Sequence, residues 1–299
     1  MALLLFLAAT VRISVPYALG AVGASVSERG GVINIGLEGM MLNGALGYTL
    51  GAYWTGDPWL GVLAALLSGV LTAALHALVT VAFRADQITS GLGINLFALG
   101  ATKFVLIQVF HSSSNSSRVP GIDLIPGLRR IPGVGEVLAT PLVLIALGLV
   151  LAAQWMLFRS VFGLRLRSIG ERPEAAATLG LSVARYRAAG VLVSGLFAGL
   201  AGAWLASEQH SFTDGMTGGR GYIAIAAMIV GKWSPTLAAA ACLLFGAAEA
   251  LQIGLQGGRL PNELLQMLPY LVTMLALAGG IGRAVPPRAI GVPYDPEHP

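Results

Sequence analysis

The chain has 299 residues, of which 56% are hydrophobic and only 11% are charged. Soluble domains carry about 25% charged residues, and a soluble fold of this length could not bury so much apolar surface. The mean hydropathy of +0.77 comes from many apolar segments rather than from a single anchor. The composition therefore excludes an ordinary soluble domain and predicts an all-α, polytopic transmembrane helical bundle.

Other counts narrow the class further. The formal net charge is +4, but the 18 Lys and Arg residues lie mostly in short loops between apolar segments, which is typical of topology signals. We therefore expect no nucleic-acid partner. The 40 glycines suit close helix packing in lipid. Cys242 lies in an apolar run and is expected to be a packing residue.

The histidines lack the spacing of metal ligands, so we expect no metal site. The four histidines are His76, His111, His210 and His298.

Apolar segments long enough to cross a bilayer predict about eight to ten spans. Two of the segments are less regular: segment 88–110 contains glycines and Asn95, and segment 219–231 is short. Each is expected to be broken or re-entrant, which requires shielding by protein or by a water-filled cavity. In chain order the segments are 2–24, 31–53, 59–82, 88–110, 139–158, 187–206, 219–231, 236–253 and 264–282.

The basic residues predict the orientation. The loop at about 159–187 contains six arginines, and the positive-inside rule places it in the cytoplasm. The N-terminus and residues 111–135 are then expected outside. Residues 1–285 form the predicted membrane domain, and the Pro-rich tail 286–299 is expected to be cytoplasmic and disordered.

Polar residues inside the apolar segments are candidates for a solute pathway, since their placement in lipid is costly. Asn34 and Glu38 are four residues apart, so on a helix they would share one face. Amides and isolated carboxylates suit a neutral, hydroxylated solute. The alternative is that these side chains form hydrogen bonds that only hold helices together. The candidates are Asn34, Glu38, Asn43, Gln87, Asn95, Glu249 and Gln252.

The basic loop contains the signals of a short capped helix. Pro173 suits the first helical position, Glu174 complements the N-terminal dipole and Gly180 suits the C-terminal cap. A short cytoplasmic helix between two spans could transmit force from a separate ATPase, although it could also be a loop that anchors topology. The sequence contains no phosphate-binding loop of the G-x-x-x-x-G-K-[ST] type, so ATP would be hydrolysed by another chain.

Four segments together resemble a known family. Asn-Ile-Gly-Leu-Glu-Gly-Met-Met begins at Asn34 after a Ser-Glu-Arg-x-Gly approach, and three later motifs follow in order at 85–96, 215–224 and 248–252. The sequence resembles the permeases of ABC importers, in the nucleoside and simple-sugar branch that is related to ribose and branched-chain amino acid permeases. The resemblance extends from about residue 10 to residue 285.

The resemblance implies a multi-pass protein of the bacterial inner membrane that imports a solute, with nucleosides expected first and simple sugars as the alternative. The implied partners are an ATP-binding subunit that holds ATP and Mg, a second and unlike permease, an extracytoplasmic solute-binding protein and membrane lipid. The chain itself is expected to bind no cofactor. The implied coupling residues are Glu171, Arg172, Pro173, Glu174, Ala175, Ala176 and Gly180.

Two other classes of protein remain as alternatives. An ion-coupled secondary transporter would use intramembrane carboxylates, for which Glu38 and Glu249 are available, but it would usually show an internal repeat. An intramembrane enzyme would need a facing pair of catalytic groups. The sequence shows neither a repeat nor such a pair, so we expect no catalytic residue.

Overall fold

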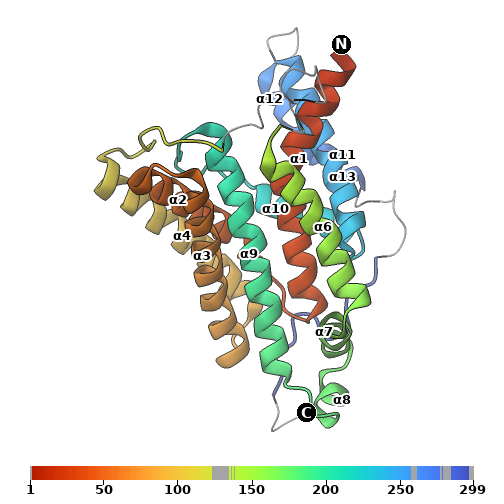
Figure 1. The fold of residues 1–299 in the computed structure, drawn as a ribbon. Helices are drawn as coiled ribbons and strands as arrows, with labels where there is room; N and C mark the ends of the chain where they lie inside the picture. Colours follow the sequence, from red (N-terminus) through yellow and green to blue (C-terminus); the bar gives the residue numbers. More distant parts are fainter. Residues whose placement is uncertain are drawn as a thin grey trace.

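The computed structural model describes residues 2–122, 135, 137, 139–256, 261–276, 278 and 284–295. All regular elements in these ranges are helices (Figure 1). In chain order they are α1 (Ala2–Arg29), α2 (Leu37–Thr55), α3 (Pro58–Ala77), the π-helical turn η1 (Leu78–Ala82), α4 (Gln87–Phe110), α6 (Pro141–Arg159), α7 (Val161–Glu171), α8 (Pro173–Thr178), α9 (Val183–Gln209), α10 (Arg220–Val230), α11 (Pro235–Leu255), α12 (Asn262–Gln266) and α13 (Leu268–Leu275).

Among the described residues, six helical segments are long and apolar enough to cross a membrane, which confirms the polytopic helical bundle. The other three apolar segments contain α2, which carries polar residues along its length, and the shorter helices around α10 and α13. Part of the last predicted span, 264–282, lies outside the described residues. The six spans are Leu3–Arg29, Pro58–Ala82, Gln87–Phe110, Pro141–Arg159, Val183–Gln209 and Pro235–Leu255.

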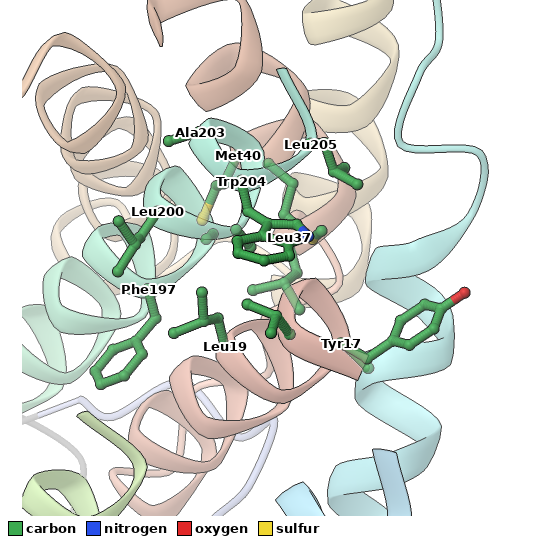
Figure 2. Packing of buried hydrophobic residues seen from close by; sticks show 14 of the residues in the cluster. Tyr17, Leu19, Leu37, Met40, Phe197, Leu200, Ala203, Trp204 and Leu205 are labelled. Carbon is green, nitrogen blue, oxygen red and sulfur yellow. The ribbon is translucent and has the colours of Figure 1, made fainter. Parts of the chain in front are cut away.

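The most buried of the six spans is α9, which packs against α2 and α3 and also against α1. Helix α2 packs against α3, α4, α9 and α10. Figure 2 shows apolar side chains of α1, α2 and α9, such as Leu19, Leu37 and Trp204, meeting in this core. Close approach depends on small residues, because a methyl group on Gly44 would lie 2.7 Å from the Cα of Gly199. Large apolar side chains on α3 and α4, such as Leu71 and Leu96, face outward, as contact with lipid requires.

Two non-helical segments interrupt the bundle, residues 30–36 before α2 and residues 210–219 before α10. The first contains Gly31, whose φ of +88° lies in the left-handed region that favours glycine. The prediction of a continuous span over 31–53 is therefore wrong at its start. Its first residues are held by tertiary hydrogen bonds rather than by helical ones.

The predicted break within 88–110 is also wrong, because α4 is continuous. Its start is fixed by Asp86, whose carboxylate accepts hydrogen bonds from the N–H and the hydroxyl of Thr89, both at 2.7 Å. These bonds lower the pKa of Asp86. Gly91 does not break the helix; it allows close packing, since a methyl group there would lie 2.8 Å from the nitrogen of Gly36.

The C-terminal segment differs from the prediction of a disordered tail over 286–299. Residues 284–295 lie against the membrane domain beside α8 (Figure 1). The guanidinium of Arg187 donates to the carbonyl oxygen of Val292 at 2.8 Å, and Tyr294 packs on a small apolar cluster beneath α7, α8 and α9. These contacts order a segment whose composition alone suggested a loose tail. The remaining residues of the tail lie outside the described part.

Candidate functional site

The first group of polar side chains surrounds residues 30–36, and we call it the junction cluster: Asn34, His76, Gln87 and Asn95. The side-chain oxygen of Gln87 accepts from the N–H of Ile33 at 2.7 Å. All four side chains are buried. Three of them, His76, Gln87 and Asn95, bond to backbone groups that the irregular segment would otherwise leave unpaired in an apolar environment.

Asn95 makes the largest number of these contacts. Its side-chain oxygen accepts from the N–H of Gly39 at 2.8 Å, and its amide nitrogen donates to the carbonyl oxygen of Ile35 and to the hydroxyl of Tyr222, both at 3.0 Å. One side chain on α4 thereby joins the end of the irregular segment, the first turn of α2 and α10.

His76 was missed by the sequence analysis, which gave it no role. Its Nε2 lies 3.0 Å from the carbonyl oxygen of Ile33, and its Nδ1 lies 2.9 Å from the hydroxyl of Ser90. Because a carbonyl can only accept, Nε2 carries the proton, and neutral imidazole accepts from Ser90 at Nδ1. An ionisable residue within a predicted span was the signal that could have identified it.

Asn34 lies in the irregular segment, so the expectation that it shares a helical face with Glu38 is wrong. Its amide nitrogen donates to the hydroxyl of Ser194 near the middle of α9 at 2.9 Å. Its side-chain oxygen and the amide nitrogen of Gln87 are buried without a hydrogen-bond partner among the described residues. Asn43 lies further along α2 and donates to the hydroxyl of Thr72 on α3 at 2.9 Å.

Glu38 joins the first turn of α2 to the N-terminus of α10. Its two carboxylate oxygens accept from the backbone N–H groups of Gly219 at 2.7 Å and Gly221 at 2.5 Å. These are N–H groups that a helix cannot satisfy internally, and a negative charge there also complements the helix dipole. Gly221 is required for this approach, since a methyl group on it would lie 2.7 Å from the Glu38 carboxylate.

The second group, which we call the cavity cluster, consists of Tyr17, Arg220, Glu249, Gln252 and Tyr270. These residues come from α1, α10, α11 and α13, and they line a cavity of about 170 Å³. The cavity brings together two predicted pathway residues, Glu249 and Gln252, with three residues that the sequence analysis did not select. Tyr17 and Tyr270 lie far from Glu249 in the sequence, and only the fold makes them neighbours.

An ion pair organises the cavity cluster. Arg220 donates from Nη2 to Glu249 at 2.9 Å, and the two side chains are 26% and 14% exposed. The hydroxyl of Tyr17 donates to the other carboxylate oxygen of Glu249; in Figure 2 this hydroxyl points away from the other labelled side chains. Arg220 also donates to the carbonyl oxygens of Met216 and Thr217 at 3.3 Å. The pair carries no net charge.

The predicted helix of the basic loop is present as α8. Pro173 occupies its first turn, and Gly180 follows its end with a φ of +80° and donates from its N–H to the carbonyl oxygen of Ala177 at 2.9 Å. Ala176 is buried, whereas Glu174, Ala175 and Gly180 are exposed.

A groove of about 400 Å³ lies between α7, α8 and the C-terminal segment. Leu179, at its edge, is 82% exposed and was not selected from the sequence. We call the groove and the exposed face of α8 the α8 surface. Its lining residues are Ser168, Glu171, Arg172, Ala175, Ala176, Leu179 and Arg288.

Residues 6–277 match the family described as the permease component of the branched-chain amino acid transport system. The chain belongs to this family. The guanosine ABC transporter permease protein NupQ of Bacillus subtilis strain 168 is 41% identical, with 96% of this chain and 95% of the relative covered. The nucleoside ABC transporter permease protein NupC of Lactococcus lactis is 40% identical (94% and 93%). A second guanosine permease protein of Bacillus subtilis, NupP, is 26% identical (89% and 79%).

Membership of this family makes the chain a membrane-embedded permease subunit of an ABC transporter and not an enzyme. ATP is hydrolysed by a separate subunit, and a binding protein delivers the solute. The chain resides in the inner membrane, in agreement with its six apolar spans. Among the residues that the structure describes, no group of three His, Cys, Asp or Glu side chains could hold a metal ion.

Proposed function

We propose that this chain is the permease subunit of a nucleoside importer. The observation that carries the proposal is the similarity over nearly the whole chain to a guanosine permease and a nucleoside permease, at 41% and 40% identity. Because the similarity covers more than nine-tenths of each sequence, it includes the membrane spans, the irregular segments and α8 together.

The cavity cluster supports a neutral solute. Its charged groups, Arg220 and Glu249, neutralise each other at 2.9 Å, so a solute with a net charge would find no unpaired partner there. Hydrogen-bonding groups of a hydroxylated solute would find both donors and acceptors. This chemistry suits a nucleoside and also a simple sugar, so the test must compare the two solutes directly.

The second permease of the importer is, in this proposal, an unlike chain. Bacillus subtilis strain 168 has two proteins described as guanosine permeases, and this chain is 41% identical to NupQ but only 26% identical to NupP. A pair of unlike permeases around one pathway would account for two such chains. This chain would then take the NupQ-like position of the pair.

The ATP-binding subunit docks, in this proposal, on the α8 surface. Glu174, Ala175 and Gly180 are exposed, and Ala175 lines a groove that is large enough for a few side chains of a partner. Leu179 is a large apolar side chain that is almost fully exposed beside charged residues of both signs. Helix α8 packs against α7 and α9 through Ala176, so a displacement of α8 would be transmitted to α9.

Leu179→Asn tests this docking. Burial of a leucine side chain stabilises a contact by about 1.5–3 kcal/mol, so the variant should reduce ATP-dependent uptake by about tenfold or more. Leu179→Met keeps the apolar contact and serves as the matched control. Since Leu179 is exposed in the isolated chain, both variants should melt at the wild-type temperature. Normal uptake by Leu179→Asn would contradict docking at this surface.

Uptake by membrane vesicles tests the proposed function. Vesicles should contain this chain with its ATPase, partner permease and binding protein, and they should be offered labelled guanosine or labelled ribose, with and without ATP. We expect guanosine uptake that requires ATP. Uptake of ribose but not of guanosine would contradict a nucleoside importer and indicate a sugar importer. Uptake that follows an imposed ion gradient without ATP would contradict an ATP-driven importer.

A further inference from the structure

The size of the cavity beside Glu249 restricts what it can hold. Its volume is about 170 Å³, below the roughly 300–1,000 Å³ of pockets that enclose a drug-sized ligand. It can therefore receive one part of a two-part solute while the other part extends outside it. A nucleoside consists of two such parts, a base and a ribose.

The polar groups of the cavity favour the base. An ionised carboxylate offers about four lone-pair positions, and Glu249 uses one for Arg220 and one for Tyr17. Acceptor capacity thus remains next to a guanidinium and next to the amide of Gln252. Guanine presents the complementary set, with acceptors at O6 and N7 and a donor at the N2 amino group.

The aromatic groups favour the same part of the solute. Tyr270 on α13 lines the cavity and is 53% exposed, and Tyr17 lines it from α1. Bases stack on aromatic side chains, and this interaction contributes strongly in proteins that bind single nucleotides or strands. The exposed ring of Tyr270, beside a donor and acceptor set, suits a base better than a ribose.

We propose that the cavity cluster holds the base of the nucleoside during its passage, with Glu249, Arg220 and Gln252 hydrogen-bonding its edge and Tyr270 contacting its ring. The proposal rests on the proposed function and goes beyond it, since it names the side chains that distinguish a nucleoside from a sugar. The Glu249–Tyr17 contact would be exchanged for contacts with the base as the solute enters.

A cysteine-protection experiment tests the proposal in the complete importer. The sequence contains one cysteine, Cys242, which is fully buried, so background labelling by a maleimide is low. Gln252→Cys places a reactive thiol in the cavity. Guanosine at ten times the concentration that gives half-maximal uptake should slow labelling by about tenfold, whereas ribose should not slow it.

Gln256→Cys is the matched control, because Gln256 directly follows α11, is exposed and does not line the cavity. Guanosine should leave its labelling rate unchanged. If Gln252→Cys abolishes uptake, Tyr270→Cys provides the second reporter. Unprotected thiols at both cavity positions, in an importer that takes up guanosine normally, would overturn this inference alone. Uptake of ribose without guanosine would overturn the proposed function as well.

Discussion

The junction cluster and the cavity cluster both place polar groups among apolar helices, but they use them differently. Asn95 in the junction cluster is 6% exposed and makes three hydrogen bonds, two of them to backbone groups. Glu249 in the cavity cluster bonds to the side chains of Arg220 and Tyr17 and lines a cavity, towards which it keeps some exposed area. The amide of Asn95 is used to hold the chain in place, whereas the carboxylate of Glu249 keeps acceptor capacity for a solute.

The difference teaches how to separate structural from functional polar residues in a membrane bundle. A side chain that hydrogen-bonds the backbone of an irregular segment cannot be removed without loss of stability, because lipid offers the backbone no replacement partner. A side chain that can exchange its partner can contact a solute without loss of the fold. The two clusters should therefore respond oppositely to substitution, with loss of stability in the first and loss of transport in the second.

Asn95→Ala should have the largest effect on stability. It leaves the N–H of Gly39 and the carbonyl oxygen of Ile35 without their partner in a buried region, at a cost of about 1–3 kcal/mol for each group. We expect a large fall in the melting temperature of the detergent-purified protein, followed by intrinsic fluorescence. Thr102→Ala is the control on the same helix, since Thr102 bonds only to carbonyls of its own helix. If both variants melt alike, the junction cluster does not hold the irregular segment.

Much of the fold could be predicted from the sequence. Composition and apolar segments identified the helical membrane bundle, and the local signals of Pro173 and Gly180 identified α8. These features depend on residues close together in the chain, such as a proline at a helix start or a glycine after a helix end. Local chemistry was sufficient for them.

The candidate site could be predicted only in part, because its geometry depends on distant residues. Asn34 and Glu38 have helical spacing, yet bonds from α3, α4 and α9 keep residues 30–36 out of a helix. Glu249 was selected from its own helix, but its partners Tyr17 and Arg220 lie on other helices. The pattern of hydropathy shows which side chains within a span are polar, but it cannot predict which of them contact each other in the folded protein.

Glu38 combines a structural contact with a link to the cavity cluster. Its carboxylate bonds to the N-terminus of α10, and the first residue of α10 is Arg220 of the cavity cluster. Glu38→Gln keeps one side-chain oxygen as an acceptor and removes the charge. A charge at a helix N-terminus contributes up to about 2 kcal/mol in partly buried positions, so the melting temperature should fall, but less than in Asn95→Ala.

The transport result for Glu38→Gln decides its role. If Glu38 only positions α10, guanosine uptake should fall in proportion to the loss of correctly folded protein, and maleimide labelling of Gln252→Cys should remain sensitive to guanosine. Glu249→Gln supplies the contrast, since it should retain the wild-type melting temperature more nearly while losing uptake. Uptake abolished by Glu38→Gln at an unchanged melting temperature would place Glu38 in the solute pathway and extend the cavity cluster across to α2.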